Sequence, residues 1–258
     1  MSAAISPVLV LMRSTLLEAR RGGLPWLALA CLAVALALAA FVSHVALTEG
    51  AALQAALLGA LLRAGAVFLV AAQVIASTLR EMHDRGLELM LSLAHSRTTH
   101  YVGRLAGFVV CAALLAVLFA VPLLAWAPPV AVAIWALSLA CEAALVAAAA
   151  LFFAMSLGQF AAAIAATIGL YLLARSIGAI QAIASGPLAD ASLAARIAQY
   201  SVDGVALLLP PLDALTRTAW LLYEPPAPGV YAAALGSAVL YIVLLAAAGL
   251  FDFHRRSL

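Results

Sequence analysis

Six long apolar runs dominate this sequence and constrain its fold more than any other feature. A bilayer has a hydrocarbon core of about 30 Å, which a helix crosses with about 20 apolar residues. Each run reaches that length, so the sequence predicts an all-α membrane protein with six transmembrane helices in a single domain, residues 1–258. The predicted spans are residues 24–46, 56–78, 101–125, 130–155, 159–180 and 229–251.

The composition excludes a soluble domain and gives no sign of nucleic-acid binding. The chain is 67% apolar and 9% charged, whereas soluble domains carry about 25% charged residues. All thirteen basic residues are Arg, a bias typical of GC-rich bacterial genomes. They are scattered in short loops rather than gathered on one face, and the net charge is only +2. We therefore expect no nucleic-acid partner.

The sequence predicts no metal site. The three cysteines all fall inside apolar runs and lack metal-ligand spacing: Cys31, Cys111 and Cys141. Three of the histidines fall close together but have no helical i, i+4 pairing, and no HExxH motif occurs: His83, His95 and His100. We therefore expect this chain to bind no metal or other cofactor.

The Arg residues predict the orientation in the membrane. Short loops on the cytoplasmic side carry an excess of Lys and Arg. Nine of the thirteen Arg lie in the N-terminal segment, the connection between the second and third spans, and the C-terminal tail. With six spans these three regions share one side. We therefore expect a multi-pass protein of the bacterial inner membrane with both termini in the cytoplasm.

Two segments outside the spans are predicted to form helices at the membrane surface. Residues 7–21 have the pattern of an amphipathic helix lying in the cytoplasmic interface. Residues 181–228 are too long for a simple external loop and contain short apolar pieces interrupted by Pro. Such pieces predict interfacial or re-entrant helices on the outer face. Candidates for an external gate there are Asp213, Arg217 and Trp220, the last with its ring at headgroup level.

A polar connection, residues 80–104, separates the second and third spans. It holds seven of the formally charged side chains, four basic and three acidic. Its middle, residues 87–93, has the pattern of an amphipathic helix. The mixed charge favours a docking surface for another protein, because a segment lying among lipid headgroups is expected to be more purely basic. The lipid-facing alternative stays open.

The polar connection has a characteristic order of residues: Glu81 and Asp84, Gly86-Leu87-Glu88, the Leu-rich residues 89–93, Ser96-Arg97 and Gly103-Arg104. Together with the six spans and the surface helices, this order resembles the membrane subunit of a type-2 ABC transporter (the ABC-2 permease family). Members of that family often have an acidic cluster, Gly-Thr-Leu, a Leu-rich stretch, Pro-x-Ser/Gly-Arg and a Gly-Lys pair. The chain departs from the pattern with Leu87, Glu88, Ala94 and Arg104 in place of Thr, Leu, Pro and Lys.

The resemblance implies that residues 80–100 form a coupling helix that docks on a separate cytosolic ATPase, which would bind ATP and Mg. The chain has no Walker loop of its own, so it is not expected to be an enzyme. A second permease copy or a paralogue would supply the other half of the pathway, and export is favoured over import. The residues implied in ATPase coupling are Glu81, Asp84, Arg85, Gly86, Glu88, Leu89, Met90, Leu93 and Arg97.

Glu142 falls about halfway through the fourth predicted span, and Arg63 falls near the outer third of the second. Either alone would cost roughly 2.5–3.5 kcal/mol on insertion. Counting from the outer ends of the spans places Glu142 about 7 Å deeper, an offset that a long Arg side chain covers. A direct Arg63–Glu142 pair is therefore one interpretation. The other is that Arg63 extends towards the headgroups while Glu142 is protonated or hydrogen-bonded to a neighbour.

The same two residues support an alternative function, an ion-coupled secondary transporter with Arg63 and Glu142 as its relay. Such transporters have internal repeats and broken central helices, but the sequence has no convincing repeat and most predicted spans are uninterrupted. An intramembrane hydrolase needs a nucleophile and a base at one depth. The six runs contain one acidic residue and no central His. The sequence therefore favours the subunit of an ATP-driven exporter.

Overall fold

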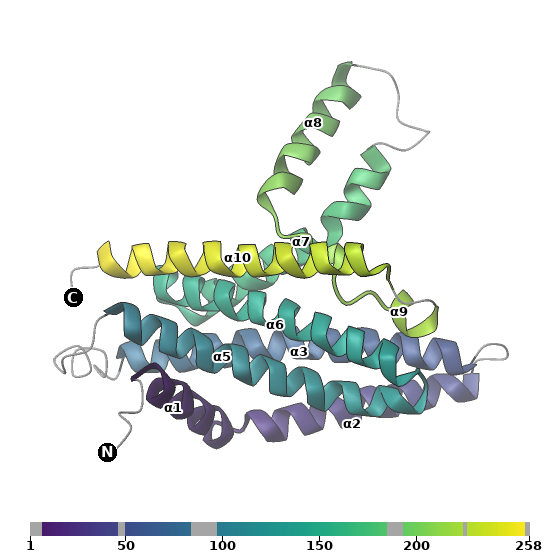
Figure 1. The fold of residues 1–258 in the computed structure, drawn as a ribbon, viewed down its shortest axis with the longest axis horizontal. Helices are drawn as coiled ribbons and strands as arrows, with labels where there is room; N and C mark the ends of the chain where they lie inside the picture. The colour runs from purple at the N-terminus through teal and green to yellow at the C-terminus, as the bar shows by residue number, and fades with distance from the viewer. Residues whose placement is uncertain (1–6, 46–49, 84–96, 185–192, 224–225, 256–258) are drawn as a thin grey trace.

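The computed structural model describes residues 7–45, 50–83, 97–184, 193–223 and 226–255, and the regular elements in these ranges are helices (Figure 1). The long helices are α1 (Pro7–Arg21), α2 (Leu24–Val45), α3 (Gly50–His83), α5 (Arg97–Ala120), α6 (Pro129–Leu157), α7 (Phe160–Ala184), α8 (Leu193–Leu208) and α10 (Pro228–Arg255). The short elements are α9 (Ala219–Leu222) and two 3-10 turns, η1 (Val121–Ala125) and η2 (Leu212–Ala214).

Six helices are long and apolar enough to cross a membrane: α2, α3, α5 continued by η1, α6, α7 and α10. This confirms the predicted all-α, six-span architecture, and the chain is a multi-pass helical membrane protein. Several helices extend past the predicted limits. α3 has 34 residues and begins at Gly50, well before the predicted start at residue 56. α7 continues to Ala184, into the segment predicted as external.

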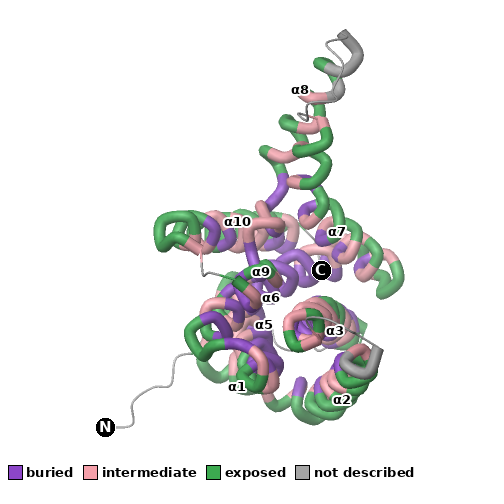
Figure 2. The backbone as a smooth tube through the Cα atoms, turned by 90° about the vertical axis from the view of Figure 1, so that its right-hand side faces the viewer, coloured by how far each residue is buried: buried purple, intermediate pink, exposed green. Residues whose placement is uncertain are grey.

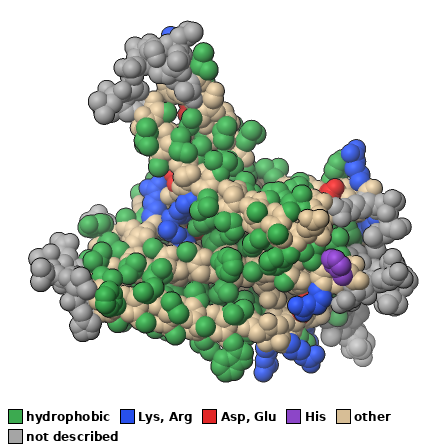
Figure 3. Space-filling view, turned by 180° about the vertical axis from the view of Figure 1, so that it is seen from behind, with side chains coloured by type: hydrophobic (Ala, Val, Ile, Leu, Met, Phe, Trp, Pro, Cys, Tyr) green, Lys and Arg blue, Asp and Glu red, His purple; other side chains and the backbone are tan. Residues whose placement is uncertain are grey.

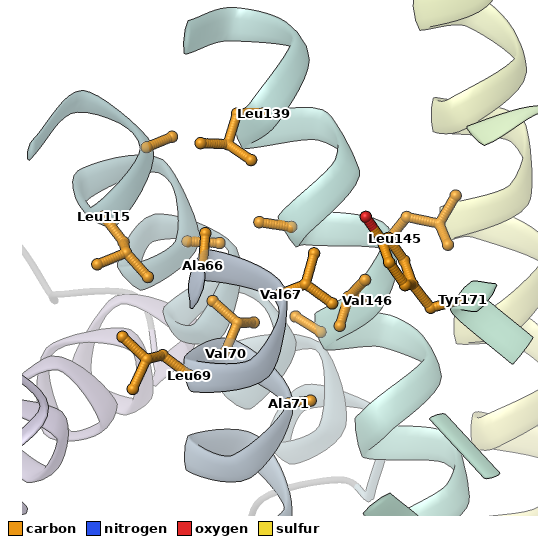
Figure 4. Packing of buried hydrophobic residues seen from close by; sticks show 14 of the residues in the cluster. Ala66, Val67, Leu69, Val70, Ala71, Leu115, Leu139, Leu145, Val146 and Tyr171 are labelled. Atoms are coloured by element: carbon orange, nitrogen blue, oxygen red, sulfur yellow. The ribbon is translucent and has the colours of Figure 1, made fainter. Parts of the chain in front are cut away.

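α6 is the central helix of the bundle. It packs against α3, α5, α7 and α10. Figure 2 shows the bundle end-on, with α1 and α2 on one side of α6 and α7 and α10 on the other. In Figure 4, Val67 of α3 lies beside Val146 of α6. Residues 147–150 of α6 are all Ala and all buried, and such small side chains let neighbouring helices approach closely.

The peripheral helices present apolar side chains outwards. Only 17% of the most apolar window is buried in α2 and in α10, against 61% in α6. Large side chains such as Phe41 of α2 and Phe251 of α10 are more than half exposed, and apolar side chains cover much of the face in Figure 3. A soluble monomer rarely exposes apolar patches of this extent. The outer surface of the bundle therefore fits hydrocarbon rather than water.

Pro and Gly set the limits of the central helices. Pro122 lies at the start of η1, where the α-helical part of α5 ends, and Pro129 is the first residue of α6. Pro fixes φ and lacks an N–H, which suits the first turn of a helix. α6 ends at Gly158, whose φ of 67° is left-handed and favours Gly. These breaks define two sharp reversals on either side of α6.

α1 lies along α5 and is joined to α2 by Gly22 and Gly23, the latter at φ 86°. Its range, Pro7–Arg21, coincides with the amphipathic helix predicted for residues 7–21. α1 lies at the same end of the bundle as the last residue of α3, the first residue of α5 and the last residue of α10 (Figure 1). We call this the α1 end, and the opposite end, which carries η1 and α9, the α9 end.

The segment between α7 and α10 contains the predicted short helices. α8 and the last part of α7 lie side by side and project from the bundle (Figure 1). After α8 the chain bends by 75° between Gln199–Leu208 and Leu212–Leu222, a break of a kind found in re-entrant segments. Pro210 and Pro211 occupy this bend. The chain then returns to the bundle through η2 and α9, which pack against α7 and α3 respectively.

Candidate functional site

Two buried polar clusters interrupt the apolar bundle. The first lies at the α1 end, where three helices contribute polar side chains to one network. We call it the α1-end cluster, and its members are Thr15, Glu18, Ser77, Glu81, His100 and Arg104. Burying charged groups is unfavourable unless they are paired and hydrogen-bonded. Each charged member of this cluster has an oppositely charged or hydrogen-bonding partner.

Arg104 is the centre of the α1-end cluster and is 6% exposed. Its Nη1 lies 2.7 Å from Glu18 Oε2, and its Nη2 lies 2.9 Å from Glu81 Oε2. Nη2 also donates to Ser77 Oγ at 2.7 Å, and Ser77 Oγ donates to Glu18 Oε1 at 2.7 Å. His100 Nε2 lies 3.2 Å from the other oxygen of Glu81. The network joins α1, α3 and α5 through a single guanidinium group.

Two glycines of α5 allow α1 to approach closely enough for this network. A Cβ at Gly103 would lie 2.8 Å from Leu11 Cβ, and a Cβ at Gly107 would lie 2.6 Å from Thr15 Cβ. Real Cβ atoms essentially never come so close. The close contact of α1 with α5 therefore depends on Gly at both positions.

The structure describes two of the nine residues predicted for ATPase coupling. Glu81 belongs to the α1-end cluster. Arg97, at the start of α5, donates from Nη1 to the carbonyl of Phe253 in α10 at 3.3 Å. The other seven lie outside the described residues: Asp84, Arg85, Gly86, Glu88, Leu89, Met90 and Leu93. Glu81 lies two residues before His83, the last residue of α3, and Arg97 is the first residue of α5. The two described members therefore flank residues 84–96.

The second cluster lies halfway along the bundle, and we call it the midspan cluster. Arg63 is the fourteenth residue of α3, and Glu142 is the fourteenth residue of α6. Both helices start at the α9 end. Because α3 starts earlier than predicted, counting residues from the two helix starts no longer gives the offset of about 7 Å between Arg63 and Glu142. The members of the cluster are Arg63, Ser138, Glu142, Tyr171, Arg175 and Thr216.

Glu142 is fully buried and has other partners than the one predicted. The Tyr171 hydroxyl donates to Oε1 at 2.8 Å, and Arg175 Nη1 lies 3.6 Å from the same oxygen. Oε2 makes no hydrogen bond within the described part of the chain. Arg63 lies in the same cluster, but its Nη1 donates to the carbonyl of Thr216 at 3.0 Å. The direct Arg63–Glu142 pair is therefore wrong, because α7 brings a closer guanidinium to the carboxylate.

The arginines of the midspan cluster also hold the bent segment after α8. Arg175 Nη1 donates to the carbonyl of Leu215 at 2.7 Å, and Arg175 Nη2 donates to that of Thr216 at 3.3 Å. The Thr216 N–H donates to Ser138 Oγ at 2.7 Å. Non-helical backbone at membrane depth has to find such partners inside the protein. These bonds hold Thr216 at φ 44°, a left-handed conformation that is uncommon for a β-branched residue.

The three external gate candidates lie in two different environments. Arg217 Nε donates to the carbonyl of Asp213 at 2.8 Å, and the two side chains form an exposed pair at 3.8 Å. Trp220 is 7% exposed and packs edge-on against Tyr231 of α10, with ring centroids 5.6 Å apart. The Trp220 ring therefore packs inside the protein, because α9 folds inward onto α3 and α6, and its position at headgroup level stays a prediction.

Most members of both clusters were absent from the predicted sites, yet the sequence carries a signal for them. Residues four apart on a helix share a face. Two such polar pairs, Ser77/Glu81 and His100/Arg104, form most of the α1-end cluster. Two more, Ser138/Glu142 and Tyr171/Arg175, form most of the midspan cluster. Arg175 lies near the end of the predicted span 159–180, and only the fold brings it to the carboxylate in α6.

The two clusters differ in charge. The α1-end cluster has two carboxylates around one guanidinium and one imidazole. The midspan cluster has two guanidinium groups and one carboxylate, an excess positive charge in the middle of the bundle. No group of three or more His, Cys, Asp or Glu among the described residues is arranged to hold a metal ion. The clusters can therefore join helices and bind charged groups.

A scan against protein-family models finds no family that matches this chain, and a search of curated proteins finds no matching relative. Its function is therefore to be inferred from its own residues.

Proposed function

We propose that this chain is the membrane subunit of an ATP-driven exporter of the ABC-2 type, with both termini in the cytoplasm. The observation that carries the proposal is the α1-end cluster. It ties the end of α3 and the start of α5 to α1, and these two helix ends border residues 84–96 of the polar connection. A protein that docks on the polar connection can thereby act on three helices together.

Coupling follows from the stiffness of this arrangement. Packed helices and buried ion-pair networks transmit displacement, because they adopt discrete arrangements rather than deforming continuously. Movement of the polar connection by an ATPase would shift α3 and α5, and α3 carries Arg63 of the midspan cluster. The pathway would then open between this chain and a second copy or a paralogue. ATP and Mg would bind to the ATPase partner.

Co-purification with an ATPase tests the proposal. Candidate ATPases from the same genome are expressed with the chain, and both binding and ATP hydrolysis are measured in detergent and in nanodiscs. Glu88→Arg in the polar connection is expected to abolish co-purification and the stimulation of ATP hydrolysis. The matched control, Asp203→Arg on exposed α8, is expected to preserve both. If no ATPase binds the wild-type chain, or if both variants behave alike, the proposal is wrong.

The midspan cluster favours a second candidate, an ion-coupled secondary transporter. A fully buried carboxylate with one oxygen free of hydrogen bonds among the described residues is suited to exchange a proton. In this function Glu142 would be the ion-binding group and Arg175 its counter-charge. Proteoliposomes separate the two candidates. Transport driven by a proton gradient without ATP, and lost in Glu142→Gln, supports the secondary transporter, whereas a strict requirement for ATP and the ATPase supports the exporter.

A further inference from the structure

A groove of about 440 Å³ lies on the outside of the bundle, and its lining includes no member of either polar cluster. Its volume falls within the range of roughly 300–1,000 Å³ typical of ligand pockets. α1, α2 and α5 form its walls, and one thiol lies in the wall of α5. The lining residues are Leu16, Leu17, Ala19, Arg20, Leu24, Pro25, Ala28, Cys111, Leu114, Leu115 and Leu118. The groove is therefore apolar along its length, with a single charged side chain.

The charged side chain lies where α1 meets α2. Arg20 and Arg21 occupy the last turn of α1 and are exposed, and α2 begins at Leu24. Trp26, in the first turn of α2, is 76% exposed. Trp side chains collect at the boundary between hydrocarbon and headgroups. These three residues therefore mark the headgroup level, and the groove runs from there between α2 and α5 into the hydrocarbon.

The mouth of the groove has a positive charge that no nearby acidic group neutralises. None of the described residues that line it is acidic. Glu18 is the closest acid along α1, but its carboxylate is bound to Arg104 and Ser77 on the other side of the helix. The N-terminus of α2 adds N–H groups of its first turn, although Pro25, its second residue, contributes none. Both features favour an anion at this position.

We propose that this groove binds one anionic phospholipid from the leaflet that faces Arg20. The phosphate lies against the Arg20 guanidinium, and one acyl chain lies between α2 and α5 along Leu114 and Leu118. Zwitterionic phospholipid binds less well, because its own cation competes for the phosphate. The site depends only on the membrane location of the chain, so it stands whether or not an ATPase binds.

A photoreactive lipid tests the site. The full-length protein is placed in nanodiscs that contain phosphatidylglycerol with a diazirine in one acyl chain, and the cross-linked peptides are identified by mass spectrometry. We expect the label to concentrate on residues 111–118 of α5 and 24–28 of α2. Arg20→Gln is expected to lower this label about fivefold, the effect of roughly one basic residue at an anionic surface. The control Arg13→Gln, on the same helix but outside the groove, keeps it.

A second pair of variants tests the acyl-chain part without changing charge. Leu114→Trp fills the groove, whereas Leu172→Trp enlarges a similarly exposed Leu on α7, and the two wild-type side chains are 60% and 58% exposed. The label is expected to fall severalfold in Leu114→Trp only. The proposal is overturned if phosphatidylethanolamine carrying the same diazirine labels these peptides equally. Equal loss in the two Arg variants, or in the two Trp variants, overturns it as well.

Discussion

Arg104 Nη1 lies 2.7 Å from Glu18 Oε2, so a helix outside the predicted spans is joined to α5 by a charge-assisted contact. The same guanidinium reaches Glu81 of α3 through Nη2 at 2.9 Å. A guanidinium presents several donors in a fixed planar fork, whereas an ammonium is a point charge. The family pattern has Lys at this position. In this chain only Arg has the geometry to hold both carboxylates at once.

Arg104→Lys is therefore expected to destabilise the protein despite keeping the charge. Arg104→Gln leaves two carboxylates without their cation and is expected to cost about 2 kcal/mol, less than a fully buried pair because Glu18 is partly exposed. The loss for Lys should be about half of that. Thermal unfolding in detergent measures both, with Arg13→Gln as the control. If Arg104→Lys is as stable as the wild type, the planar geometry of the guanidinium does not contribute to stability.

Arg175 rather than Arg63 is the ionic partner of Glu142, and a mutant cycle distinguishes them. Arg175→Leu leaves the buried carboxylate without its cation and is expected to cost about 3 kcal/mol. Adding Glu142→Gln should recover at least 1 kcal/mol, because the buried carboxylate that lost its cation is then neutral. Adding Glu142→Gln to Arg63→Leu should recover much less of the lost unfolding free energy. Unfolding free energies of the wild type, the three single variants and the two double variants provide the test, and equal recovery in both doubles would contradict the assignment.

The six spans were predictable because each depends on local composition. Twenty apolar residues in a row have few alternatives to a membrane helix, and α1 likewise coincides with its amphipathic pattern. Helix ends were less predictable, since α3 starts at Gly50, several residues before the apolar run begins. That shift alone changed the depth of Arg63 relative to Glu142.

The clusters were only half predictable, for a different reason. Intramembrane charge identified Arg63 and Glu142 as unusual, but their partners depend on which helices become neighbours. Arg175 lies near the end of the predicted span 159–180 and becomes the partner of Glu142 only because α7 packs against α6. The burial of Trp220 was equally hard to predict. Trp is typical of membrane interfaces, but here its ring packs against Tyr231 because of how the chain folds.

Thr216 is held at φ 44° by its neighbours, so its backbone favours Gly. Thr216→Gly relieves a left-handed β-branched residue, which typically costs about 1–2 kcal/mol, but it also removes a fully buried side chain and its 3.4 Å contact to Ser138 Oγ. We therefore expect a stability close to that of the wild type. Ser138→Ala, by contrast, leaves the buried Thr216 N–H without its acceptor and should cost about 1–3 kcal/mol. Thermal unfolding compares them, and the opposite order would refute the role of Ser138.

Gly107 sets the distance between α1 and α5, and Gly169 of α7 provides a matched comparison. A Cβ at Gly107 would lie 2.6 Å from Thr15 Cβ, whereas a Cβ at Gly169 has nothing within 4 Å. Gly107→Ala is expected to displace α1, weaken the Arg104–Glu18 contact and cost about 1–3 kcal/mol, as overpacking typically does. Gly169→Ala should be neutral or stabilising by up to about 1 kcal/mol, because Ala favours helix.

Thermal unfolding reports the stability of both Gly variants, and a pair of spin labels reports the position of α1. The labels are attached to cysteines that replace two exposed residues, Leu9 of α1 and Val102 of α5, in a background without the three native cysteines. Adding Gly107→Ala should lengthen or broaden the measured distance between the labels, and adding Gly169→Ala should leave it unchanged. Equal distances in the two backgrounds would mean that α1 keeps its place on α5 without Gly107.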